Sequence, residues 1–219
     1  MANLDKAKKS HKVDSAPEPK AKLAPKPAPV KKPATPHEPH YPNGVWQKSM
    51  SKKYTVIKDT REKDGWFFSE YNRCAGMDIG TLHTGDYTIK GFEDVVCIER
   101  KACASEIAMN LGRKKKAFQA EIERMRDYEF SFIVCEFSME DVLKFPEGSR
   151  VPRQARSNVR ITGKYLLKCL MEFQIWYDTK IIFCGNKGNA FLVCDSIFKR
   201  LNELFHMRDK DGPNQETAF

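Results

Sequence analysis

The chain has 219 residues, a formal net charge of +9 and seven cysteines. An odd number of cysteines without a C-x-x-C pair indicates small core thiols in a reducing compartment, and argues against a zinc site. No apolar run is long enough for a membrane span, and no apolar segment follows the first charged residues, so we expect neither a membrane segment nor a signal peptide. We therefore expect an intracellular protein, cytoplasmic and nucleoid-associated if bacterial or phage, and nuclear if eukaryotic.

Residues 1–52 are predicted to form a disordered basic arm. Up to Lys53 the chain holds 12 lysines against 4 acids and 9 of its 12 prolines, so nearly the whole net charge lies there. The arm has too few large apolar residues to form a core. It could bind phosphate backbone in a salt-dependent way, or it could be a tether to a protein partner. Residues 53–206 are then the globular domain, and 207–219 a polar C-terminal tail.

The globular part begins with a β-branched and aromatic run at 54–58, which predicts a first strand. Apolar residues at positions 66, 67, 68, 71 and 74 have nearly helical spacing, so a helix is expected over 66–74, with its end at Gly76. The same reading predicts, in order, strands at 79–89 and 94–100, a helix over 104–125 interrupted by Gly112, a strand at 130–135, a short helix at 139–143, a surface loop over 144–160, a helix at 161–176, a strand at 180–184 and a closing helix at 189–205.

This alternation of strands and helices predicts the fold class. The later strands are short and wholly apolar, which is typical of strands covered on both faces. We expect an α/β protein with a mixed central sheet flanked by helices in three layers.

Charged residues gather at the predicted strand ends. Gly91, between Asp86 and Glu99, predicts a turn, so a hairpin would return Glu99 beside Asp86. Side chains alternate along a strand, which places Glu99 and Lys101 on one face and Arg100 on the other. Two acids and a lysine would then share one small volume.

Such a group has the chemistry of a metal-dependent hydrolase. The carboxylates of Asp59, Glu62, Asp86 and Glu99 are oxygen ligands suited to magnesium, which keeps waters that can meet a phosphate. The ammonium of Lys101 could position the attacking water or stabilise charge on the phosphate. From spacing alone, an ordinary solvated cluster of salt bridges remains an alternative.

Three short sequence motifs, in this order along the chain, favour the metal-dependent hydrolase over the solvated cluster. They are Ile57-Lys-Asp-Thr-Arg-Glu62, Gly85-Asp-Tyr87 and Ile98-Glu-Arg-Lys101, and they resemble the signature of the XPF-type structure-specific nuclease family. The resemblance implies a restriction-endonuclease-like core of the PD-(D/E)XK type and a Mg²⁺ requirement that Mn²⁺ can meet. It also implies cleavage of branched or flapped DNA by a homodimer formed through the nuclease domain.

The same resemblance implies a role for each residue. Asp86 and Glu99 would be metal ligands together with Asp59, and Lys101 would be the catalytic lysine. Arg61 and Glu62 would complete the catalytic site, while Arg100 would be structural or would contact phosphate.

The chain departs from the family pattern in two places. The acid that usually follows the lysine by four residues is replaced by Ser105, and the next residue, Glu106, could substitute for it. On the following helix the family has an arginine four residues before a glutamine, whereas here Lys115 precedes Gln119.

Further basic residues are candidates for DNA binding, with a solvated surface as the alternative. They belong to the run after Gly112 and to the loop over 144–160, where arginine can pair with phosphates and stack on bases. These candidates are Arg113, Lys114, Lys115, Lys116, Gln119, Arg150, Arg153 and Arg156.

The sequence thus predicts a Mg²⁺-dependent DNA endonuclease that is selective for flaps, forks or other branched DNA in repair, recombination or replication. Two other functions stay open. The chain could be a non-catalytic DNA-binding or scaffold subunit, or a less selective DNase on the same core.

Overall fold

The computed structural model describes residues 52–147, 149 and 151–211, with side chains up to residue 206. Most of the predicted arm, Arg150 and residues 212–219 of the predicted tail lie outside this part, so the expected domain limits stay predictions. Within the described part, no helix has the length and hydropathy needed to cross a membrane.

A six-stranded mixed sheet forms the centre of the molecule, in the order β2-β1-β3-β4-β5-β6. Strand β1 runs parallel to β2 and antiparallel to β3, β3 is antiparallel to β4, and β4, β5 and β6 are mutually parallel. The strands are β1 (Tyr54–Asp59), β2 (Cys74–Gly80), β3 (Tyr87–Ile89), β4 (Val96–Lys101), β5 (Phe130–Cys135) and β6 (Lys180–Phe183).

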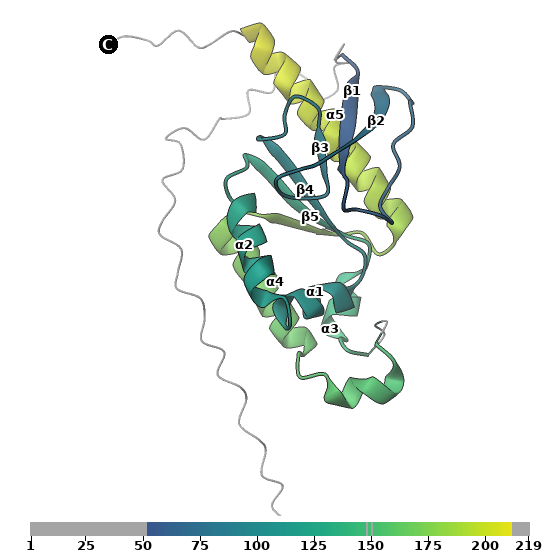
Figure 1. Cartoon of the computed structure of the whole chain (residues 1–219), viewed down its shortest axis with the longest axis vertical. Coiled ribbons are helices and arrows are strands. Elements are labelled where there is room, and N and C mark those ends of the chain that lie inside the picture. The colour runs from purple at the N-terminus through teal and green to yellow at the C-terminus, as the bar shows by residue number, and fades with distance from the viewer. Residues whose placement is uncertain (1–51, 148, 150, 212–219) are drawn as a thin grey trace, which may run out of the picture. The chain divides into compact units, whose positions relative to one another are not determined.

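Helices cover both faces of this sheet (Figure 1). One layer holds α1 (Ala104–Leu111), α2 (Lys115–Met125), α3 (Met139–Leu143) and α4 (Gly163–Tyr177), and the other layer is the long helix α5 (Lys187–Asp211). Each layer has its own buried core against the sheet, and the two cores share no residue. The three-layer α/β fold with a mixed central sheet that the sequence predicts is confirmed.

The predicted helix over 66–74 is wrong. Trp66 and Phe68 are buried while Phe67 between them is 72% exposed, which is the alternation of an extended chain. The Trp66 and Phe68 rings pack against Tyr87 with centroid distances of 5.0 and 5.9 Å. Tertiary packing of alternate residues therefore sets the conformation here, and Cys74 begins strand β2.

The expected strand over 79–89 is also wrong in extent, because two strands, β2 and β3, contribute to it from either end. The expected break in the first long helix is confirmed, since α1 ends at Leu111 and α2 begins at Lys115. A Cβ on Gly112 would lie 3.3 Å from the Ile161 side chain, so little space exists there for a larger residue. The expected loop over 144–160 contains a 3₁₀ helix, η1 (Arg153–Asn158).

Candidate active site

The β3–β4 hairpin brings Asp86 beside the end of β4. The Asp86 N–H donates to the Ile98 carbonyl at 2.8 Å, and the Arg100 N–H donates to Asp86 Oδ2 at 2.8 Å. Gly85 makes this approach possible, because it has a φ of +79° and a Cβ there would lie 2.6 Å from Cys97 Sγ. The predicted hairpin is confirmed, and the glycine before Asp86 has a steric reason.

Glu99 and Lys101 lie on one face of β4, as their spacing indicates. Lys101 Nζ lies 2.5 Å from Glu99 Oε1 and 3.6 Å from Glu106 Oε1, and both members of the first pair are buried. The same ammonium lies 5.0 Å from the centre of the Phe118 ring on α2. The pair therefore sits under the α1–α2 layer, with Glu106 reaching over from α1.

Burial and charge set the protonation of this group. Burial raises the pKa of Asp86, and repulsion from Glu99 raises it further. Burial likewise raises the pKa of Glu99, although Lys101 opposes the shift and Glu121 adds to it. Burial alone would lower the pKa of Lys101, but Glu99, Glu121 and Glu106 outweigh it and raise that pKa. Lys101 is thus an ammonium at neutral pH, able to stabilise negative charge but not to act as a base.

Asp59 has a different environment, at the C-terminal end of β1. Its carboxylate accepts hydrogen bonds from Arg61 Nε at 2.7 Å and Nη2 at 3.0 Å, and from the N–H groups of Arg61 and Leu82 at 2.8 Å each. Burial raises the pKa of Asp59, but these donors outweigh it, so the pKa is lowered. The expectation that Asp59 binds metal stays a prediction, and its occupied oxygens favour a structural role in which it fixes Arg61 and the loop at Leu82.

Arg100 points to the opposite face from Glu99, toward helix α5. Its Nε and Nη2 donate to the two carboxylate oxygens of Glu136 at 2.7 and 2.9 Å, and its Nη1 lies 3.4 Å from Glu62 Oε1. Trp66 Nε1 also donates to Glu136, at 2.8 Å. Of the two roles expected for Arg100, this buried and fully paired guanidinium favours the structural one.

A polar pocket of about 660 Å³ opens beside these residues. Glu62 and Arg61 from the loop after β1 line it, together with Arg100 and Glu106. Repulsion from Glu99 and, more weakly, from Glu62 raises the pKa of Asp86, so this carboxyl lies within electrostatic reach of both acids. The structure thus brings Glu62, Asp86, Glu99 and Lys101 into one region.

The candidate DNA-binding residues are more scattered. Arg113, Lys114, Lys115 and Lys116 are exposed around the α1–α2 break, and Gln119 donates to Glu123 at 3.0 Å. In η1, Arg153 is exposed, and Arg156 Nε donates to the Val151 carbonyl at 3.2 Å. Arg150 lies outside the described residues. DNA binding by all of these residues stays a prediction.

Three charged residues of this region were missed by sequence reasoning. Glu136 directly follows the apolar strand β5, the same signal that identified Asp59 after β1, so it could have been found. Glu121 lies among several charges on an amphipathic helix, and Lys187 begins the last helix, where nothing in the sequence distinguishes either residue from a solvated one.

The donor chemistry fits a magnesium ion held by two acids. Within the described ranges, no group of three or more histidine, cysteine, aspartate or glutamate side chains stands ready to bind a metal. Magnesium commonly binds through one or two carboxylates and completes its shell with water and substrate phosphate. Asp86 and Glu99 are two such carboxylates, and each is disfavoured as a bare anion by burial. At the position of the missing family acid, the Ser105 Oγ is buried without a hydrogen-bond partner.

In this mixed sheet, Glu99 and Lys101 at the end of the central strand β4 and Asp86 before β3 form one group of charges. The ERCC4 domain model matches residues 58–191, more than half of the chain, and the chain belongs to this family. The expected membership among XPF-type nucleases is thereby confirmed.

Two solved structures are similar to this chain. XPF from Aeropyrum pernix is 19% identical, with a TM-score of 0.49, over 75% of this chain and 67% of that one. XPF from Aeropyrum pernix in complex with DNA is 20% identical, with a TM-score of 0.46, over 69% of this chain and 66% of that one. Curated proteins give no match. The fold assignment rests on the sheet order and the layers described above.

Proposed function

We propose that this chain is a Mg²⁺-dependent endonuclease that hydrolyses phosphodiester bonds in flapped, forked or otherwise branched DNA during repair, recombination or replication, and that Mn²⁺ can replace Mg²⁺. One observation carries the proposal. Asp86, Glu99 and Lys101, the residues expected to do the chemistry, are all present and meet at the end of β4. Membership in the ERCC4 domain family supports DNA as the substrate.

Each residue has a task in this proposal. Asp86 and Glu99 would hold the metal, which when bound supplies an activated water and a Lewis acid for the phosphate. Lys101, kept as an ammonium by its acidic neighbours, stabilises the charge that develops on the phosphate oxygens. Arg100 and Glu136 brace Glu62 from behind, so that Glu62 faces the pocket in a fixed position.

A non-catalytic DNA-binding or scaffold subunit is the main alternative function. A subunit without catalytic duty has no need to keep a buried acid pair around a buried lysine, because buried charges are costly to maintain. The second alternative is a less selective DNase. Its chemistry would be the same, so the choice of substrate alone separates it from the leading proposal.

Cleavage of a panel of labelled DNA molecules tests the proposal. We expect the wild-type protein to cut flap or fork DNA with Mg²⁺, and Asp86→Asn or Lys101→Met to reduce the rate at least about a hundredfold while DNA binding is retained. Asp94→Asn, an exposed acid in the β3–β4 turn, is the matched control. A wild-type protein inert on flap, fork, nicked and linear DNA with either metal would support the scaffold. Equal cutting of linear and branched DNA would support the less selective DNase.

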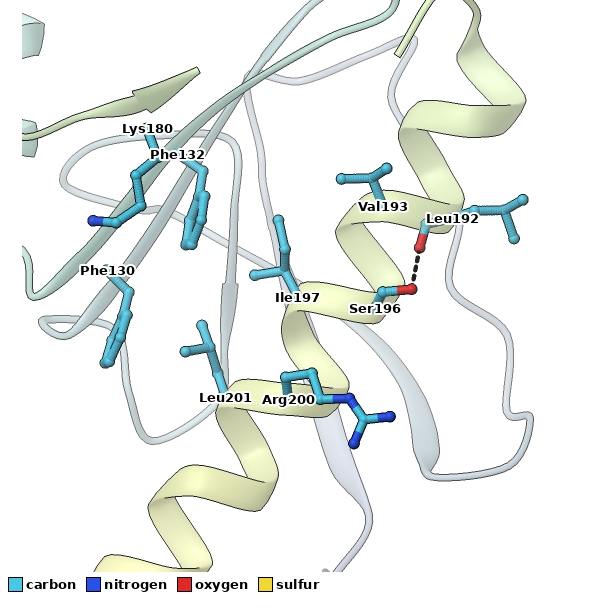
Figure 2. Close-up of a pocket in the computed structure, with 9 residues that line it drawn as sticks. All are labelled: Phe130, Phe132, Lys180, Leu192, Val193, Ser196, Ile197, Arg200 and Leu201. Carbon is cyan, nitrogen blue, oxygen red and sulfur yellow. Dashed lines mark hydrogen bonds between the residues drawn. The ribbon is translucent and has the colours of Figure 1, made fainter. Parts of the chain in front are cut away.

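We also propose that the chain forms a homodimer through the nuclease domain, as the family resemblance implies. An apolar groove of about 560 Å³ lies between β5 and α5. In Figure 2, Phe130 and Phe132 of β5 face Ile197 and Leu201 of α5. Leu192 at its edge is 60% exposed. Exposed apolar patches of this kind mark interaction surfaces, which makes this groove the candidate dimer contact.

A further inference from the structure

The polar pocket beside the candidate active site is lined by charges from several parts of the chain. The loop after β1 contributes Glu62, Lys63 and Asp64, and the start of α5 contributes Lys187. Helix α5 is thus joined to the catalytic region by a lysine that is more than 80 residues away from the family motifs in sequence.

Most charges on this pocket are already neutralised. Arg100 is paired with Glu136 and Glu62, and Arg61 is paired with Asp59. Glu106 lies 3.6 Å from Lys101 and also accepts the Ala102 N–H at 2.9 Å. Each of these positive charges therefore already faces at least one carboxylate.

Lys187 is outside this network. Its Nζ donates to the main-chain carbonyl of Asp64 at 2.7 Å, and it forms no ion pair within the part of the chain that the structure describes. The carbonyl orients the ammonium without neutralising it. Lys63 lines the same wall of the pocket, one residue before Asp64, and also forms no ion pair with a described residue.

Both ends of this contact are held in place. The Asn189 N–H donates to Asn186 Oδ1 at 2.8 Å, which caps the start of α5 next to Lys187. On the other side, the Asp64 N–H donates to Glu62 Oε1 at 3.0 Å, and Glu62 is braced by Arg100. The hydrogen bond therefore joins the Lys187 ammonium to the loop that carries Glu62.

We propose that Lys187 binds a backbone phosphate of the DNA next to the bond that is cut, with Lys63 as a secondary contact. This inference rests on the proposed function, because it names a substrate contact of that same pocket. An ammonium that is oriented by a carbonyl and forms no ion pair with a described residue, in a pocket that Glu62 of the family motif also lines, suits the phosphate of a nucleic-acid backbone. The role is positioning and binding, because Lys187 does not touch the group formed by Asp86, Glu99 and Lys101.

The charge of Asp64 should have the opposite effect on DNA affinity to that of Lys187. Its carboxylate is exposed on the same wall of the pocket and repels a phosphate that approaches Lys187. Removing that charge should therefore strengthen DNA binding, whereas removing Lys187 should weaken it.

Salt-dependent binding of a labelled flap DNA, measured in Ca²⁺ to prevent cleavage, tests the inference. Each phosphate neutralised contributes about 0.9 to the slope of log K against log salt concentration. We expect Lys187→Gln to lower this slope by about 0.9 and affinity by about fivefold to tenfold at physiological salt. Lys187→Arg should preserve both, and Asp64→Asn should raise the affinity. In cleavage assays with Mg²⁺, Lys187→Gln should raise KM and leave kcat nearly unchanged.

The control is Lys90→Gln. Lys90 is an exposed lysine in the β3–β4 turn, and it forms an ion pair with Asp78 of β2. That turn packs through Phe92 against Phe205, near the other end of α5 from Lys187. An unchanged slope and KM in Lys187→Gln, or a loss equal to that of Lys90→Gln, would overturn the inference even if the wild-type protein cleaves DNA. A wild-type protein that binds but never cleaves would instead overturn the proposed function, and the slope would still decide the role of Lys187.

Discussion

At the scale of single residues, the candidate site depends on the close packing of Gly85 against Cys97 and Ile98 of β4. The positive φ is costly for any residue with a Cβ, and the space beside it is filled by Cys97 and the carbonyl of Ile98. Both effects act directly before Asp86, so the placement of this carboxylate depends on the absence of one methyl group.

Gly85→Ala should therefore lower the free energy of unfolding by more than the cost of the positive φ alone. The new Cβ would lie 2.6 Å from Cys97 Sγ and 3.1 Å from the Ile98 carbonyl oxygen. We expect a loss of about 2 to 4 kcal/mol in the free energy of unfolding, measured by urea titration. Gly91→Ala is the control, because its φ is +87° but its Cβ would meet nothing within 4 Å. It should lose only about 1 kcal/mol, and equal losses in the two variants would contradict the steric argument.

Asp59 provides a test by pH. Its pKa in the folded protein lies below the ordinary value of 3.8, so its stabilising contribution is present above that value and is lost as the pH falls through the lower, folded pKa. Asp59→Asn should cost on the order of 2 kcal/mol at pH 7, because a buried acceptor of four hydrogen bonds is replaced by a neutral amide. The difference between Asp59→Asn and wild type should shrink below about pH 4.

Urea unfolding at pH 7 and pH 3 measures this difference, with the exposed Asp94→Asn as the control. A difference that stays constant with pH would contradict the pairing of Asp59 with Arg61. A Mg²⁺-induced rise in the unfolding midpoint that is lost in Asp59→Asn would instead restore Asp59 as a metal ligand.

At the scale of elements, what the sequence predicts depends on whether the cause is local. The β4 strand and its hairpin to Asp86 follow from an apolar run, a turn glycine and strict alternation, all within a few residues of one another. The same alternation correctly separates Glu99 and Lys101 from Arg100. The break at Gly112 is equally local, because glycine weakens a helix wherever it stands.

The features that could not be predicted have distant causes. The extended chain at Trp66 and Phe68 is set by the Tyr87 ring and by α5, whose contacts are not visible in the periodicity of residues 66–74. Likewise the pairing of Arg100 with Glu136 joins two neighbouring parallel strands across a long helical connection. Sequence alone therefore located the candidate catalytic residues, but not the Arg100–Glu136 pair that holds Glu62 in place.

At the scale of the whole molecule, α5 connects the two surfaces that the proposals use. Its first residue, Lys187, lines the charged pocket, and its middle part forms one wall of the apolar groove (Figure 2). Five residues of helix, a rise of about 7.5 Å, separate Lys187 from Leu192. A dimer formed through the groove would thus hold two pockets in a fixed relation, which suits a substrate with more than one duplex arm.

The dimer proposal leads to a prediction about association. Leu192 is 60% exposed, so Leu192→Glu should leave the fold of the single chain intact but place a charge at the edge of the contact. We expect the wild-type protein to sediment as a dimer at micromolar concentration, and the dissociation constant of Leu192→Glu to rise in analytical ultracentrifugation by about tenfold. Ile175→Glu is the matched control, since Ile175 is 75% exposed on α4, in the opposite helical layer. Dissociation by Ile175→Glu but not by Leu192→Glu would move the contact to that layer, and a monomeric wild-type protein would exclude the dimer.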